Sequence, residues 1–179
     1  MGASSWIYFV PYDTDLGEAL WRLRHDVFTR GEFEGPFGMT VAEAAEMSDE
    51  EIKAAVAENF GFDPGELDDV DEAMVPHSEP RDELDQRIER VLTMTMDSGT
   101  HSILDMARVG DSPEIGVVAP IGSDDLDRVL GTRTPTKAQI DAAREELWQL
   151  RDRWEGSVVV VHDDAARPTE LCFLGFSGD

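Results

Sequence analysis

The spacing of apolar residues along the chain predicts most of its strands and helices. Residues 5–12 (SWIYFVPY) are rich in aromatic and β-branched side chains and close at Pro11, which is typical of a β-strand. Two-residue alternation places Ile7 and Phe9 on one face of this strand and the side chains between them on the other face. Both faces are therefore apolar.

A helix is expected to follow, capped by Asp13 or Thr14 and ended by Gly31. Its apolar stripe consists of Leu16, Leu20, Leu23 and Val27. The same patterns predict short helices at about 41–47 and 49–60, a loop at 61–80, a helix at 81–96, strands at 101–109 and 114–119, a short helix at 124–130, a long helix from about 134, and strands at 157–162 and 169–176.

This order predicts an α+β protein of one domain, residues 1–179, with a helical acidic insertion at about 31–98. Without the insertion, the elements follow the ferredoxin-like order β-α-β-β-α-β with an extra C-terminal strand. In that order the first strand pairs centrally, and the strands at 101–109 and 114–119 form a hairpin. Residues 157–162 and 169–176 form a second hairpin.

Several strands, including SVVVVH at 157–162, are apolar on both faces. A sheet that is covered on one side alone would have polar residues on its other side. We therefore expect a second cover, which is either the helical insertion or a second copy of the chain. The latter would be a homodimer through the sheet.

Charge distinguishes one part of the chain from the rest. The 179 residues include 39 acids and 15 bases, a net charge of −24. Residues 40–98 alone carry eighteen acids and four bases, or −14. A surface of this sign disfavours binding to nucleic acid and to anionic membranes. The sequence has no apolar run of about 20 residues and no secretory signal, and its single cysteine suits a reducing compartment, so we expect a cytoplasmic protein.

Three short segments resemble a known group of proteins. SWIYFVPY at the start, GTHSILD at 99–105 and the closing Gly175-Phe176-Ser177 are similar to segments of uncharacterised small bacterial proteins. The resemblance covers about 40 residues and leaves the acidic insertion unmatched. It implies a shared fold and no activity.

Three polar residues in apolar surroundings are candidates for a ligand pocket: Tyr8, His101 and Asp105. On a strand, His101 and Asp105 would lie on the same face about 13 Å apart, too far to share a ligand unaided. A charge inside an apolar run needs a partner. The simplest expectation for Asp105 is a salt bridge, for example with Arg108 or with a helix arginine, and the alternative is a binding-site carboxylate.

The common signatures of nucleotide, zinc-protease, hydrolase and redox sites are absent from the sequence. The acidic stretch 63–72 lacks the order of a calcium loop, and Asp163 and Asp164 suit a turn. No metal or cofactor is therefore expected. His25 and Cys172 are expected to pack without a functional role.

These features favour a protein without catalytic activity that binds a basic partner through residues 40–98, as an inhibitor or immunity protein does. The residues chosen for this docking surface are Asp68, Asp69, Asp71 and Glu72. One alternative is a small enzyme or ligand-binding protein with a pocket between the sheet and the insertion. Another is that the acidic surface reflects solvation in high salt alone.

Overall fold

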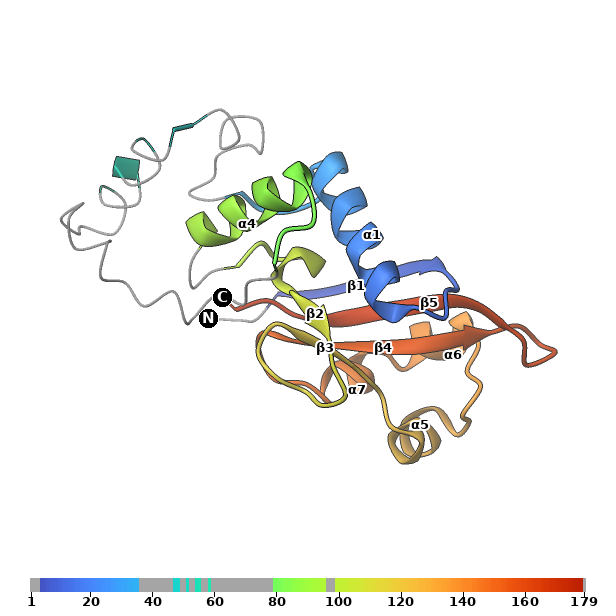
Figure 1. Ribbon diagram of the computed structural model, residues 1–179. Helices are drawn as coiled ribbons and strands as arrows, with labels where there is room; N and C mark the ends of the chain where they lie inside the picture. Colours follow the sequence, from blue (N-terminus) through green and yellow to red (C-terminus); the bar gives the residue numbers. More distant parts are fainter. Residues whose placement is uncertain are drawn as a thin grey trace.

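The computed structural model describes residues 4–35, 79–95 and 99–178, together with 47–48, 51, 54–55 and 58 (Figure 1). Within these ranges the chain is α+β, with helices on both faces of a mixed sheet. Among the helices of the described residues, none combines the length and the apolar character needed to cross a membrane.

Five strands form the sheet, in the spatial order β1-β5-β4-β3-β2. They are β1 (Ser5–Pro11), β2 (Arg108–Val109), β3 (Val117–Pro120), β4 (Glu155–His162) and β5 (Pro168–Phe176). β5 pairs antiparallel with both β1 and β4, which confirms the predicted C-terminal hairpin. β3 pairs parallel with both β4 and β2.

The strand order differs from the ferredoxin-like order, which is not confirmed. β1 lies at one edge of the sheet and pairs with β5, whereas the prediction placed it centrally. The predicted hairpin between 101–109 and 114–119 is wrong, because β2 and β3 run parallel.

The predicted strand at 101–109 is also wrong over most of its length. Residues Ile103–Asp105 form a short 3-10 helix, η5, and the strand is reduced to β2. Ser102 caps η5 by accepting a hydrogen bond from the Leu104 backbone amide at 3.2 Å. A short apolar run has no decisive period, so this capping and burial outweigh strand propensity.

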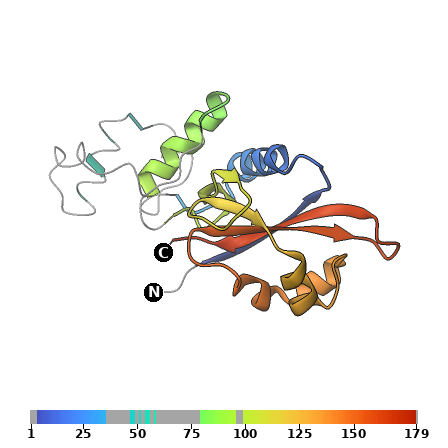
Figure 2. The same cartoon turned by 60° about the horizontal axis from the view of Figure 1, so that its bottom comes forward.

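Two layers of helices cover the sheet (Figures 1 and 2). On one face lie α1 (Leu16–Arg30), α4 (Glu83–Thr95) and η5, and on the other lie α5 (Ser123–Leu130), α6 (Lys137–Ala142) and α7 (Arg144–Trp148). The second face is thus covered by residues 123–150, where the sequence predicted the insertion or a second copy. One chain therefore accounts for the apolar strand faces that motivated a homodimer, and the homodimer stays a prediction.

Each face of the sheet has its own apolar core. The first core contains Trp6, Leu23, Val27 and Phe173, and the second contains Ile140, Leu147, Val159 and Cys172. Ile7 and Phe9 pack on the second core, as the alternation in β1 predicted.

Local signals place the helix ends. Asp15 caps α1 by accepting the Glu18 amide at 2.9 Å, one residue beyond the predicted cap, and Gly31 ends α1 with φ 67° as predicted. The predicted long helix from 134 is instead two short helices, since the backbone departs from helical geometry at Ala143. Ser48 and Glu51 form a capping box at the start of the predicted helix 49–60, while most of 41–47 and 49–60 lies outside the described residues.

Candidate functional site

The four residues predicted to dock a basic partner are not among those that the structure describes. Asp68, Asp69, Asp71 and Glu72 all lie outside the described residues. Docking through them therefore stays a prediction.

The other predicted group, Tyr8, His101 and Asp105, does come together. The Tyr8 hydroxyl hydrogen-bonds the backbone of Ile103, in the turn that joins His101 to Asp105. Burial is the main cause that raises the pKa of Tyr8. The residues lie at the junction of β1, η5 and the end of β5.

Asp105 is held by neutral donors. Its side chain is 1% exposed, and Oδ1 accepts hydrogen bonds from the Thr100 amide and the Thr100 hydroxyl, each at 2.8 Å. The expected salt bridge is wrong for the described residues, where Arg108 pairs with Glu114 at 2.6 Å. Burial raises the pKa of Asp105, against the opposing effects of the Ser177 hydroxyl and of Thr100.

Described neighbours pack closely around Asp105. Oδ2 and the buried Ser177 hydroxyl lie near each other, but neither makes a hydrogen bond of good geometry within the described chain. A Cβ on Gly99 would come within 2.8 Å of Oδ2 and 3.0 Å of the Trp154 ring. Asp105 is therefore closely packed against Gly99, Thr100 and Trp154, and its role in binding a ligand stays a prediction.

His101 links Ser4, just before β1, to the loop after α1. Its Nδ1 lies 3.1 Å from the Ser4 hydroxyl and 3.3 Å from the Glu34 carboxylate. The Glu34 amide donates to the Thr100 carbonyl at 2.9 Å. The backbone of His101 is left-handed, with φ 54°, and these contacts hold it in that conformation.

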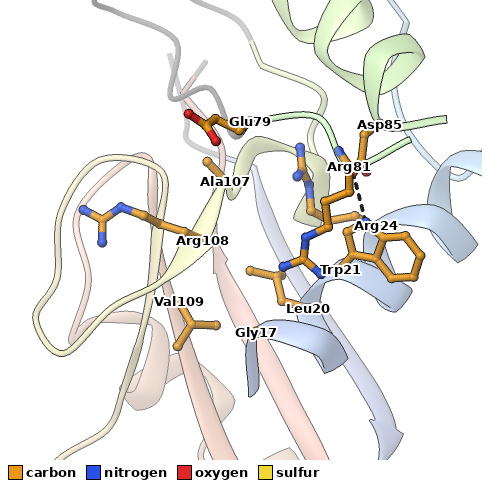
Figure 3. A pocket seen from close by; sticks show the side chains of 10 residues that line it. All are labelled: Gly17, Leu20, Trp21, Arg24, Glu79, Arg81, Asp85, Ala107, Arg108 and Val109. Atoms are coloured by element: carbon orange, nitrogen blue, oxygen red, sulfur yellow. Dashed lines mark hydrogen bonds between the residues drawn. The ribbon is translucent and has the colours of Figure 1, made fainter. Parts of the chain in front are cut away.

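A pocket of about 240 Å³ lies elsewhere, between α1, β2 and the chain that enters α4 (Figure 3). Its wall combines apolar side chains with five charged ones. The lining residues are Gly17, Leu20, Trp21, Arg24, Glu79, Arg81, Asp85, Ala107, Arg108 and Val109.

Three arginines reach this pocket from separate segments. Arg24 lies on the buried face of α1, is 3% exposed, and donates to Glu89 at 3.1 Å and to the Leu104 carbonyl at 3.4 Å. Arg81 extends from the chain before α4 toward α1, as Figure 3 shows, and its guanidinium lies 5.7 Å from the Trp21 ring centre. Arg108 lies on the opposite wall, and in Figure 3 its guanidinium points away from Arg24 and Arg81.

The exposed arginines already hold carboxylates. Arg81 Nη1 lies 3.3 Å from Glu18, and Arg108 Nη2 lies 2.6 Å from Glu114. Exposed pairs of this kind contribute about 0–1 kcal/mol, so a competing anion can displace them at small cost.

Asp85 is fixed in the pocket wall by a set of donors. Its Oδ2 accepts from the Trp21 indole at 3.0 Å and from the Arg81 amide at 2.8 Å, and its Oδ1 lies 2.6 Å from His25 Nε2. Burial opposes ionisation, but these hydrogen bonds outweigh it and lower the pKa of Asp85. His25 thus positions a buried carboxylate, where the sequence predicted mere packing.

His25, Asp82 and Asp85 each offer one atom suitable for a metal ion, all within 4.8 Å of one another. Hydrogen bonds occupy these atoms, however, since Asp82 Oδ1 accepts the Asp85 amide at 2.9 Å and Asp85 bonds His25 directly. We therefore assign no metal to this cluster.

The arginine pocket was not predicted from the sequence. The one available signal was Arg24, because it interrupts the buried stripe of α1 between Leu23 and Val27. A basic residue on the core side of a helix needs an acceptor or a solvent-filled space. Arg81 and Arg108 have no comparable signal in their local sequence.

Comparison with known proteins adds no further assignment. No protein-family model matches the chain, and neither a curated protein nor a solved structure matches it.

Proposed function

We propose that this protein binds a small molecule in the pocket between α1, β2 and the chain that enters α4. The observation that carries this proposal is the pairing of a concave space with fixed charged groups, because Arg24 and Asp85 are both buried in its wall. Binding sites typically combine apolar walls with a few polar groups held in place. Leu20 and Val109 supply the apolar part here.

The volume of the pocket and the side chains that line it indicate which kind of ligand and activity it can support. Drug-sized sites span about 300–1,000 Å³, so a pocket of about 240 Å³ suits a compact metabolite. Its described lining contains no hydroxyl, thiol or amine to act as a nucleophile. The lone pairs of Asp85 already accept hydrogen bonds. We therefore propose binding, without a chemical step.

A fragment screen tests this function. Amide spectra of the isotope-labelled protein are recorded with a library of anionic, cationic and neutral fragments, and resonances of Trp21 and Val109 report binding. The blocking variant is Gly17→Leu, because Gly17 lines the pocket and a Cβ there would meet only Asp15 Oδ1, at 3.4 Å, so that a larger side chain is expected to fill part of the space. Gly122→Leu on the opposite face is the matched control, since nothing lies within 4 Å of its Cβ position.

The proposal expects at least one fragment to shift these resonances saturably in the parent and in Gly122→Leu, and not in Gly17→Leu. If fragments of all three charge classes leave the pocket resonances unchanged, the protein does not bind ligands here.

The charge distribution favours a second candidate, docking of a basic protein on residues 40–98. Their net charge of −14 is more than half of the total. Two of the four bases in that segment, Arg81 and Arg87, contact Glu18 and the Phe28 ring of α1. These contacts direct positive charge toward the fold and leave an acidic excess for a partner.

Neutralising Asp68, Asp69, Asp71 and Glu72 to the corresponding amides tests this second candidate. Proteins that co-purify with the parent at low salt are identified by mass spectrometry, and the same is done for the variant and in molar salt. A basic protein that co-purifies with the parent at low salt, and is absent both from the variant and from the parent in molar salt, supports docking. Equal recovery from parent and variant contradicts it, and unfolding at low salt with recovery in molar salt identifies the acidic surface as salt adaptation.

A further inference from the structure

Arginines gather at this pocket in a chain that is acidic overall. The whole chain carries 24 more acids than bases, yet three of its arginines and two of its acids line this one space. The two lining acids are Glu79, which is exposed, and Asp85, which is buried.

Neither lining acid holds a lining arginine through its side chain in the part of the chain that the structure describes. The oxygens of Asp85 accept from Trp21, from the Arg81 backbone and from His25. Glu79 is directed away from Arg81 in Figure 3. The guanidinium groups of Arg24 and Arg81 are instead paired with Glu89 and Glu18, which do not line the pocket.

Arginine suits one class of ligand above others. A guanidinium presents a planar fork of N–H donors that matches carboxylate and phosphate oxygens in pairs. In this protein Arg24, Arg81 and Arg108 already hold the carboxylates of Glu89, Glu18 and Glu114. Arg24 is fixed by its buried contacts, whereas Arg81 and Arg108 are exposed and can change partner.

From these observations we infer that the pocket binds the phosphate or carboxylate group of a small metabolite, with Arg81 as the main contact, Arg108 recruited from the opposite wall, and Arg24 as the buried source of positive charge. This inference rests on the proposed function and names its ligand class. Glu18 and Glu114 act as internal competitors that the ligand displaces.

The competitors provide the test. Binding of inorganic phosphate and of citrate is measured by calorimetry and by the Trp21 indole resonance, with sodium chloride added to keep the ionic strength constant. Glu18→Gln and Glu114→Gln each release an arginine, so each should tighten binding, by up to about fivefold for an exposed pair. Arg81→Gln should weaken binding at least about tenfold, the scale of one charge-assisted hydrogen bond.

Arg128→Gln is the matched control, because Arg128 is an equally exposed arginine paired with Asp125 on α5, on the opposite face of the sheet. It should bind phosphate and citrate as the parent does. A stronger response to phosphate than to citrate identifies a phosphate ligand, and the reverse identifies a carboxylate.

Three results would overturn the inference. Neutral or cationic fragments that occupy the pocket, while phosphate and citrate do not, would show the ligand class to be wrong and leave the proposed function intact. Unchanged or weaker binding in both Glu18→Gln and Glu114→Gln would remove the displacement argument. Equal losses in Arg81→Gln and Arg128→Gln would show unspecific attraction to surface charge. No binding by any fragment instead refutes the proposed function itself.

Discussion

Replacing Asp105 by asparagine should stabilise the protein at neutral pH. The side chain is 1% exposed, and its Oδ1 accepts from the Thr100 amide and hydroxyl, both of which asparagine can retain. Its Oδ2 lies near the buried Ser177 hydroxyl, whose effect on the carboxyl is to lower its pKa against the effect of burial. An amide nitrogen in place of Oδ2 can donate to Ser177 and removes the buried charge.

The expected gain follows from the removal of the buried charge. A carboxylate buried without a countercharge costs more than its amide, which can keep the hydrogen bonds from Thr100 and exchange the contact with Ser177 for one that it donates. We expect Asp105→Asn to raise the free energy of unfolding by about 1–3 kcal/mol at pH 7. For a chain of this size, each kcal/mol moves the midpoint of thermal unfolding by about 2–4 °C.

The effect should depend on pH in a defined direction. Burial raises the pKa of Asp105 in the folded state above its ordinary value of 3.8. At a pH between 3.8 and the folded pKa, the folded state therefore binds more protons than the unfolded state. The stability that Asp105 contributes is therefore complete below pH 3.8 and is lost as the pH rises through its folded pKa. The difference between Asp105→Asn and the parent should widen as the pH rises above 3.8 and become constant once the carboxyl is ionised in both states.

Urea denaturation followed by circular dichroism at several pH values measures this difference and cancels the effect of the total charge. Asp105→Ala is the comparison, because it leaves the Thr100 amide without its acceptor and should cost about 1–3 kcal/mol. If asparagine destabilises as much as alanine, and most strongly at pH 7, the reasoning is refuted. The carboxylate would then be ionised and needed, as expected of a binding site.

Three further substitutions or probes test other parts of the fold. Asp85→Ala removes the acceptor of Trp21, His25 and the Arg81 amide, so urea denaturation should show that the free energy of unfolding falls by about 2–4 kcal/mol at pH 7. Because the pKa of Asp85 is lowered, this loss should shrink as the pH falls below 3.8. Glu83→Ala, at an exposed position of the same helix, should cost little. Gly99→Ala places a Cβ at a position with a φ of 70° and 2.8 Å from Asp105, so it should lower the free energy of unfolding by about 2–4 kcal/mol and lower the thermal midpoint accordingly. An unchanged midpoint, as expected for the control Gly122→Ala, would contradict the packing at Gly99. Burial raises the pKa of Cys172 to about 12, so a thiol reagent at pH 8 should react at the rate of unfolding, and rapid labelling of the native protein would contradict its burial.

The sequence alone determined the elements whose signals are local. Alternation in β1, the helical stripe of α1, the αL glycine at Gly31 and the turn between β4 and β5 each depend on a few neighbouring residues. The sequence also identified Asp105 as a buried polar group, because a charge inside an apolar run is buried together with its neighbours. The predicted arginine partner of Asp105 was wrong, since the neutral donors of Thr100 bind its carboxyl group instead.

Tertiary structure decided the strand order, the parallel pairing of β2 and β3, and the second cover of the sheet. It also decided the pocket, because Arg24, Arg81 and Arg108 come from segments that are distant in sequence. Periodicity tells which side of an element faces a core, but not which other element shares that core. The pocket depends on how α1, β2 and the start of α4 pack together, and that arrangement has no local signature.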